Sequence, residues 1–295
     1  MSGPDELDLR ELNLHEPHPH EPRPHELCLR ELHAIEEFEE VCRLFGGIWR
    51  PDPGGEPITV EMMRALSHAG NYVAGAYRHD RLVGASVGFV AAPPRRALHS
   101  HVTGALSGQG AGFALKLHQR EWALERGLET ITWTYDPLVR RNAHFNLAKL
   151  GARPEEYLPA FYGIMGDAIN AGDESDRVLA VWRLTSPPVL AAVRREPFPV
   201  EIPPDAVTGL DDDGGRPARG RTDAKTVLVA VPGDIETLRV TDPAAARAWR
   251  LALREVLGGL LRDGAQVTGF HDKSCYVVRR GAPEEGRGGD GRALS

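Results

Sequence analysis

The sequence is poor in cysteine and has no long apolar run. Its 295 residues include only three cysteines, Cys28, Cys42 and Cys275, whose spacing fits neither a disulfide framework nor a metal site. No stretch approaches the roughly 20 consecutive apolar residues of a membrane-spanning helix. The first 32 residues also lack the apolar core of a signal peptide. We therefore expect a soluble, cytoplasmic protein in a reducing compartment, with no membrane partner.

An excess of positive charge is also missing. The chain has 35 lysines and arginines against 42 aspartates and glutamates, which gives a net charge of −7. Nucleic-acid-binding domains carry a basic surface, so we expect no nucleic-acid partner. A local basic patch for a phosphate ligand remains compatible with this balance.

Both ends of the chain are compositionally biased. Residues 1–32 are rich in glutamate, proline and histidine, with His15, His18, His20 and His25 close together. Such a segment either binds a metal or stays disordered because it cannot bury enough apolar surface, and we favour disorder. The glycine-rich residues 281–295 predict a disordered tail.

Hydrophobic periodicity divides the remainder of the chain. Residues 33–185 alternate strand-like and helical patterns and predict the main domain. Residues 186–225 hold much proline, glycine and aspartate and predict an irregular linker. Residues 226–280 contain a strand pattern, a long amphipathic helix and two further strand patterns, which predict a smaller C-terminal αβ lobe.

A glycine loop is the most informative motif. Residues 107–112 read Ser-Gly-Gln-Gly-Ala-Gly and lie between a strand-like segment, 97–106, and a helical segment that runs to Leu128. Glycines at Gly108, Gly110 and Gly112 leave backbone N–H groups bare at a helix N-terminus, which favours a bound phosphate. A P-loop is disfavoured because no Gly-Lys-Ser/Thr follows. A Rossmann site is disfavoured because Asp136 stands in a proline turn.

The order of elements around this loop resembles the GNAT acetyltransferase superfamily. The strand, the glycine loop and the helix are followed by a second strand at 130–135, a break at Pro137 and a helix over 142–150. The resemblance covers roughly residues 37–184. It implies an α/β (α+β) fold: a mixed, mostly antiparallel sheet with a splayed central strand pair. The C-terminal lobe is then either a degenerate repeat of that fold or a lobe that completes the acceptor pocket.

In that family the acyl-CoA loop reads Gln/Arg-x-x-Gly-x-Gly/Ala. The chain offers two registers, one starting at Ser107 and one at Gln109. Leu147 stands where the family often has the tyrosine that protonates the leaving thiolate. The resemblance implies acetyl-CoA, or another acyl-CoA, as co-substrate and no metal. It implies that the cofactor is held by Val102, Gly104, Gln109, Gly110, Ala111, Gly112, Phe113 and Asn142.

Three residues are candidates for proton transfer. His101 shares a strand face with His99 and is a candidate base, the alternative being a histidine packed in the sheet. Asp136 at the end of the second strand could accept a proton from an ammonium group, or simply cap an Asx-Pro turn. With Leu147 unable to act as an acid, Tyr157 is a candidate proton donor, with Tyr162 as the other option and a structural role as the alternative for each.

The helix after the loop carries a further pair of basic residues. Lys116 and Arg120 lie one turn apart and are expected at its exposed surface, either on the phosphates or merely solvated. We place the apolar face of this helix on a stripe of Phe113, Leu117 and Leu124 and on an adjoining stripe of Ala114, Leu115 and Trp122.

The resemblance implies an acyl-CoA-dependent N-acyltransferase, most simply an N-acetyltransferase in which an amine attacks the thioester directly. The acceptor, a small-molecule amine or a protein amine, stays open, as does a homodimer. The alternative is a catalytically inactive GNAT-like module that binds CoA or another ligand in a regulatory role. Ser107 and Leu147 favour this alternative, whereas the intact Gly110 and Gly112 favour the enzyme.

Overall fold

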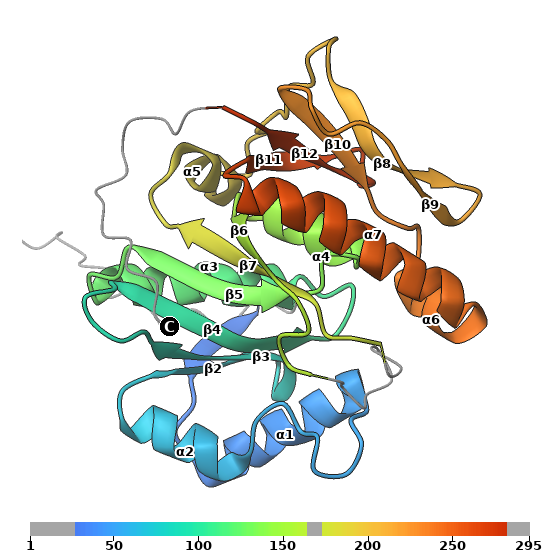
Figure 1. Cartoon of the computed structure of the whole chain (residues 1–295). Coiled ribbons are helices and arrows are strands. Elements are labelled where there is room, and N and C mark those ends of the chain that lie inside the picture. The colour runs from blue at the N-terminus through green and yellow to red at the C-terminus, as the bar shows by residue number, and fades with distance from the viewer. Residues whose placement is uncertain (1–26, 164–172, 282–295) are drawn as a thin grey trace, which may run out of the picture.

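The computed structural model describes residues 27–163 and 173–281. They form two β-sheets with helices packed on them (Figure 1). The first sheet has the strand order β1-β2-β3-β4-β5-β7-β6, and the second has the order β11-β12-β10-β8-β9. The strands are β1 (Cys28–Glu31), β2 (Tyr72–Arg78), β3 (Arg81–Val90), β4 (Ala97–Ala105), β5 (Thr130–Tyr135), β6 (Arg153–Leu158), β7 (Arg177–Arg183), β8 (Val207–Asp213), β9 (Arg216–Arg219), β10 (Thr226–Ala230), β11 (Gln266–His271) and β12 (Cys275–Arg279).

Three of the described helices begin at a side chain that caps their first N–H groups. The Thr59 hydroxyl accepts a hydrogen bond from the N–H of Met62, the Asp234 carboxylate from the N–H groups of Glu236 and Thr237, and the Asp242 carboxylate from the N–H of Ala245. The helices are α1 (Ile35–Trp49), α2 (Val60–His68), α3 (Ala111–Glu125), α4 (Arg140–His144) with its π-helical continuation η1 (Phe145–Lys149), α5 (Pro187–Val193), α6 (Ile235–Thr241) and α7 (Pro243–Arg262).

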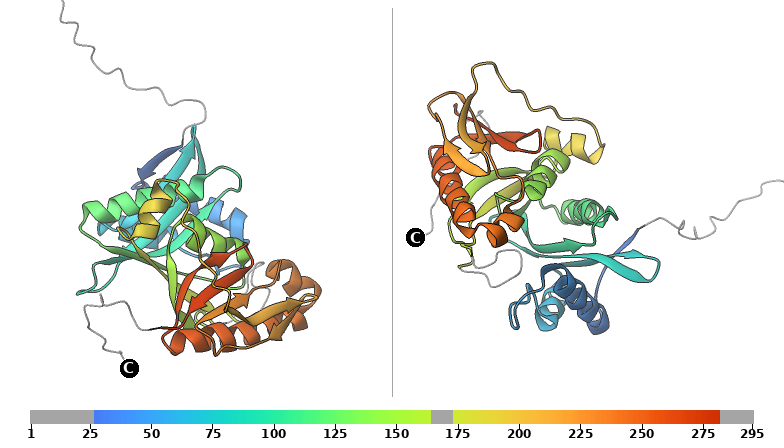
Figure 2. Two further views of the ribbon diagram at one scale, coloured as in Figure 1. Left: turned by 90° about the horizontal axis from the view of Figure 1, so that it is seen from above. Right: turned by 90° about the vertical axis from the view of Figure 1, so that its right-hand side faces the viewer.

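The first sheet carries helices on both faces. Helices α1 and α2 cover one face of β2 to β4, and α3 covers the other (Figures 1 and 2). Glycines on neighbouring strands permit this close packing. A Cβ at Gly84 of β3 would lie 3.0 Å from Leu115 of α3, and a Cβ at Gly104 of β4 would lie 2.6 Å from Trp49 of α1.

The central strands β4 and β5 run parallel and separate after three residue pairs. Residues 97–99 pair with residues 130–132, and beyond them β4 pairs only with β3 while β5 pairs with β7. We call residues 100–105 of β4 and 133–135 of β5 the splayed segment. A β-bulge lies in it, because Val102 faces Val87 and Ser100 faces Gly88, which leaves His101 without an opposite residue. The predicted splayed pair in a mostly antiparallel sheet is confirmed.

Both sheets contribute to one hydrophobic core. Its largest buried side chains include Trp182 of β7, Trp249 of α7 and Tyr276 of β12. The Tyr276 hydroxyl donates to the carbonyl of Pro137 at 2.8 Å, and the Arg140 guanidinium donates to the carbonyl of Val231. The C-terminal lobe is therefore packed on β6, β7 and α4 as part of the same body (Figure 2).

The second sheet repeats a strand order of the first. In the first sheet β5 is followed by a helix and by the hairpin β6–β7, and β7 lies between β5 and β6. In the second sheet β10 is followed by α6 and α7 and by β11–β12, and β12 lies between β10 and β11. Both middle strands are antiparallel to both neighbours. This repetition agrees with the expected degenerate repeat.

Several predicted boundaries differ from the structure. The segment 186–225 is not an irregular linker, because it contains α5, β8 and β9. Ordered structure begins before residue 33: β1 pairs with β2, and its Glu31 carboxylate accepts a hydrogen bond from the indole of Trp122. Strand β6 was not predicted. Helix α1 continues through Gly46 and Gly47 to Trp49, because both glycines keep helical geometry.

The remaining terminal predictions lie outside the described residues. These are the disorder of residues 1–26 with their histidine tract, and the tail from residue 282 onward. Among the helices that the structure describes, none has the length and apolar character needed to cross a bilayer.

Candidate functional site

The glycine loop leads into α3 with its N–H groups uncapped. Gly110 is the N-cap residue with φ of 70°, Gly108 has φ of 75°, and no side chain caps the helix. A Cβ added at either glycine would have no atom within 4 Å, so the space beside the loop is open. The first N–H groups of an α-helix, here those of Ala111, Gly112 and Phe113, have no acceptor within the helix. This arrangement suits a bound anion.

A partly buried arginine supports the loop. The Arg78 guanidinium, at the end of β2, donates to the backbone carbonyl of Gln109 at 3.2 Å. Arg78 Nε and Gln109 Oε1 are buried, and neither has a hydrogen-bond partner in the described part of the chain. A positive charge next to bare N–H groups favours a diphosphate over a neutral ligand.

The Val102 side chain, and a Cβ added at Gly104, both point from β4 toward α1. Val102 packs against the core under α1 and α2. Gly104 is needed for packing, since Trp49 occupies the place of its side chain and stacks edge-on against Phe45 at 4.9 Å between ring centroids. Trp49 thus packs against the core under α1 and α2. Only the backbones of Val102 and Gly104 are available to a ligand in the splayed segment.

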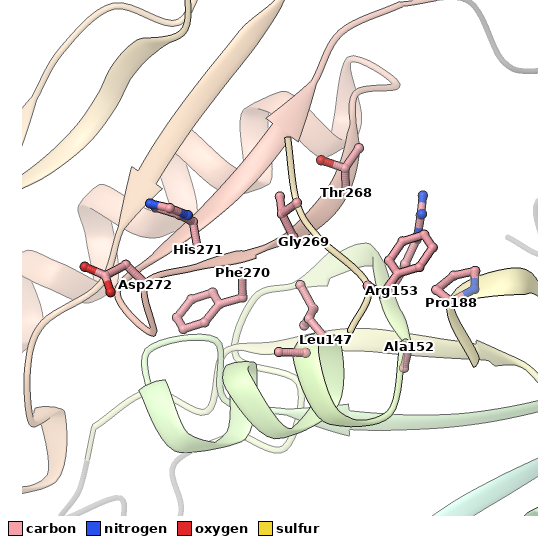
Figure 3. A pocket seen from close by; sticks show the side chains of 13 residues that line it. Leu147, Ala152, Arg153, Pro188, Thr268, Gly269, Phe270, His271 and Asp272 are labelled. Atoms are coloured by element: carbon pink, nitrogen blue, oxygen red, sulfur yellow. The ribbon is translucent and has the colours of Figure 1, made fainter. Parts of the chain in front are cut away.

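Asn142 is half-exposed and lies in α4, the helix that follows β5 in the sequence. Leu147 of η1, by contrast, is buried and faces the C-terminal lobe. It lines a pocket of about 210 Å³ together with Arg153, Phe198 and Phe270 (Figure 3). This pocket lies between the lobes, and no residue of the glycine loop lines it.

His101 and His99 lie near each other on β4, where the bulge falls. His101 is exposed, its Nε2 donates to the Pro57 carbonyl at 3.1 Å, and its ring packs against Phe89. Nδ1 of His101 has no hydrogen-bond partner among the described residues. His99 is hydrogen-bonded to the Thr132 hydroxyl, and burial, with help from nearby His101 and Lys116, lowers its pKa to about 4. His99 is therefore neutral at neutral pH.

Asp136 is not placed to act as a base. Its carboxylate accepts hydrogen bonds from the guanidinium groups of Arg239 and Arg250 and from the N–H of Leu138, and only 7% of the residue is exposed. Burial acts to raise its pKa, but the two arginines overcome that effect and leave the pKa of Asp136 well below its usual range. The hydrogen bond from the N–H of Leu138 forms the Asx turn that was the alternative prediction for Asp136.

Tyr157 is not placed to act as an acid either. Its hydroxyl donates to the buried carboxylate of Asp176 at 2.8 Å. Burial raises the pKa of Tyr157 well above 10, and the negative charge of Asp176 adds to this effect. The ring packs on Gly258 of α7, in the interface between the lobes. Tyr162 is different, because it is 43% exposed and shares a hydrogen bond with Thr134 of β5.

Lys116 and Arg120 do not lie on an exposed helix surface. Lys116 is 4% exposed and faces the sheet. The Arg120 Nε donates to the carbonyl of Leu184. The predicted apolar face of α3 is confirmed at Leu115 and Trp122, whereas Phe113, Leu117 and Leu124 are only partly buried. The buried row is Ala111, Leu115, Lys116, Gln119, Trp122 and Ala123.

This row is the signal that the sequence reasoning missed. Residues spaced three or four apart share one helix face, so Gln119 lies between Lys116 on one side and Leu115 and Trp122 on the other. A helical projection centred on Gln119 would have placed this lysine against the sheet. The contacts of Asp136 had no such signal, because its partners lie 103 and 114 residues away.

Comparisons with known proteins give structural matches only. No protein-family model matches the chain, and no curated protein sequence matches it. Its fold is similar to that of an N-acetyltransferase from Staphylococcus aureus Mu50, with 11% identity, 54% of this chain and 99% of that chain covered and a TM-score of 0.43. It is also similar to a GNAT-family acetyltransferase from Streptococcus pneumoniae, with 17% identity, 53% of this chain and 98% of that chain covered and a TM-score of 0.44. A third match is Mycobacterium smegmatis RimJ in complex with CoA-disulfide, with 17% identity, 57% of this chain and 88% of that chain covered and a TM-score of 0.43.

Proposed function

We propose that this chain is an acyl-CoA-dependent N-acyltransferase that transfers an acyl group, most simply acetyl, to an amine. One observation carries the proposal. The parallel strands β4 and β5 separate, and β4 then leads into an open glycine loop and the uncapped N-terminus of α3. The loop offers N–H groups for a diphosphate. The edge that β4 leaves unpaired beyond His99 can pair with the extended arm of the cofactor.

The residues present fit this co-substrate. In the proposed complex, the diphosphate lies on the N–H groups of Ala111, Gly112 and Phe113, and Asn142 contacts the arm. The amine attacks the thioester carbonyl directly, so that positioning and a proton acceptor are the main requirements. Since Asp136 is engaged with two arginines, we assign the acceptor role to His101, whose Nδ1 has no hydrogen-bond partner in the described part of the chain and whose ring is exposed.

The binding test uses calorimetric titration with acetyl-CoA. Gly112 is a better site for a disruptive substitution than Gly110, because the φ of 70° at Gly110 would strain any side chain. A Cβ at Gly112 would meet only the Cβ of Ala105, at 3.8 Å. We expect Gly112→Glu to fold, since a carboxylate in the first turn stabilises a helix, and to lose binding by at least about 10-fold because it repels phosphate.

Ala244→Glu is the matched control. It places the same charge at the same position of a helix, the second residue of α7, on an exposed surface. This variant should bind acetyl-CoA as the wild type does. Equal binding of acetyl-CoA by Gly112→Glu and wild type would show that the ligand does not bind at this loop. Absence of binding by the wild type would refute the transferase proposal. Binding of acetyl-CoA without transfer to any amine tested would favour the inactive binding module.

A further inference from the structure

The ammonium group of Lys116 lies at the point where β4 and β5 separate. Its Nζ donates to the hydroxyl of Ser100 at 2.8 Å and lies 4.1 Å from the centroid of the Trp133 ring. Ser100 is the first residue of β4 beyond the last pair with β5, and Trp133 is the first such residue of β5. The lysine of α3 therefore contacts both strands at the closed end of the splayed segment.

Among the residues that the structure describes, no carboxylate compensates this ammonium. Its other hydrogen bond goes to Gln119 Oε1 at 3.2 Å, and Gln119 in turn donates to Ser86 of β3. From β4, α3 and β5 it faces Ser100, Gln119 and Trp133, and no described carboxylate forms an ion pair with it. His99 is the titratable group that interacts with it electrostatically. An isolated cation kept from water acts strongly on a nearby anion.

The direction of the strands fixes which part of the co-substrate would approach it. Strand β4 runs from its pairs with β5 toward the glycine loop, so the loop stands at the open end of the splayed segment and Lys116 at the closed end. With its diphosphate on the loop, the arm extends along β4 toward Ser100. The sulfur at the far end of the arm then lies toward Nζ of Lys116.

We propose that Lys116 is the proton donor to the leaving thiolate in the acyl transfer, an assignment that rests on the proposed function. The C–N bond forms as the amine attacks, the C–S bond breaks, and its electron pair leaves on sulfur. The Lys116 ammonium transfers one proton to that sulfur, which gives CoA as the free thiol. The neutral Lys116 amine is then reprotonated from solvent, to which the attacking nitrogen has released its proton through His101.

Two observations support this role. Two of the other candidate positions are unavailable, because Leu147 is apolar and the Tyr157 proton is held by Asp176, whereas Tyr162 bonds to Thr134, one residue beyond the Trp133 that Lys116 contacts. In addition, burial lowers the pKa of Lys116 to about 7. An ammonium with that pKa gives up its proton to a thiolate, whose thiol has a pKa near ~8.5, much more readily than an ordinary lysine does.

The test titrates the thiol of bound CoA and needs no acceptor. Thiolate ultraviolet absorbance is followed against pH for CoA saturated with protein, after subtraction of the protein alone. A cation beside the sulfur stabilises the thiolate and the thiolate in turn favours the charged form of Lys116, so the two groups titrate as a pair and wild-type protein should lower the apparent thiol pKa relative to free CoA. Lys116→Met, similar in length and uncharged, should abolish that shift while calorimetry still detects CoA binding.

The control is Lys149→Met, which removes an exposed lysine from η1 and should keep the wild-type shift. Lys116→Gln, which can still bond to Ser100, provides a second uncharged variant in case Lys116→Met does not fold. The same thiol pKa in wild type and in either folded Lys116 variant would overturn the assignment and leave the proposed function standing. Failure of wild-type protein to bind CoA would overturn both.

Discussion

Lys116 lowers the stability of the folded chain because its charge is buried without a counter-charge. Burial moves its pKa from 10.5 to about 7. Between these values the unfolded chain holds a proton that the folded chain does not, so folding becomes more favourable as pH rises. Below about pH 7 both states are protonated and the full penalty remains.

We predict that Lys116→Met is more stable than wild type at neutral pH. The advantage should shrink by about 1.4 kcal/mol per pH unit between about pH 7 and pH 10.5, as the wild type loses its penalty. Urea unfolding at a series of pH values measures this difference. A difference that stays constant across that window would show that the Lys116 ammonium is not desolvated as the structure indicates.

Packing at the element level depends on Gly104, where β4 meets α1. We predict that Gly104→Ala lowers the free energy of unfolding by about 1–3 kcal/mol, because the new methyl group would lie 2.6 Å from the Trp49 ring. Gly112→Ala is the control, since its methyl group has room and alanine favours a helix. Adding Trp49→Leu to Gly104→Ala should recover part of the loss in urea unfolding; no recovery would place the strain elsewhere.

Elements with strong local patterns were predictable and others were not. Strand β5 was predicted with its observed bounds, 130–135, because apolar and polar residues alternate along it. Strand β6 reads Arg-Pro-Glu-Glu-Tyr-Leu, and a proline with two adjacent glutamates conceals an edge strand. The hairpin of β8 and β9 turns at Gly214–Gly215, a turn signal that was attributed to a linker.

Some features of the candidate site could likewise be predicted from the sequence, and others could not. The glycine loop and its helix N-terminus are local features, and the sequence was sufficient to predict them. The roles of Asp136 and Tyr157 depend on residues of the C-terminal lobe, and no local pattern indicates which buried arginine meets which carboxylate. Lys116 lies between these cases, because its burial follows from helical periodicity but its place beside Ser100 follows from the sheet.

At the scale of the molecule, the two lobes are joined by buried charge as well as by the common core. Asp136 at the end of β5 meets Arg239 of α6 and Arg250 of α7, and Asp173 accepts from the same two arginines. Removal of one partner from such a group leaves the others buried with their charge uncompensated. The cluster therefore couples the stability of one lobe to that of the other.

We predict that the wild type unfolds in one calorimetric transition and that Asp136→Asn loses about 3–5 kcal/mol of stability. The wild-type contribution of Asp136 persists above the pKa of an unfolded aspartate and is lost as pH falls below it, because the folded pKa is lower. Asp223→Asn, in an exposed pair with Arg221, should leave the stability nearly unchanged. Two separate wild-type transitions would contradict the shared core.

The hydrogen bond from Arg78 to the carbonyl of Gln109 has a consequence for how freely the sequence can vary. Tips of hairpins ordinarily tolerate substitution and insertion, since little packs on them. The β2–β3 turn begins at Arg78, whose guanidinium holds a loop 31 residues further along the chain. Selection for ligand binding would then act on an exposed turn that contacts no ligand, and relatives that lengthen this turn would need a different support for the glycine loop.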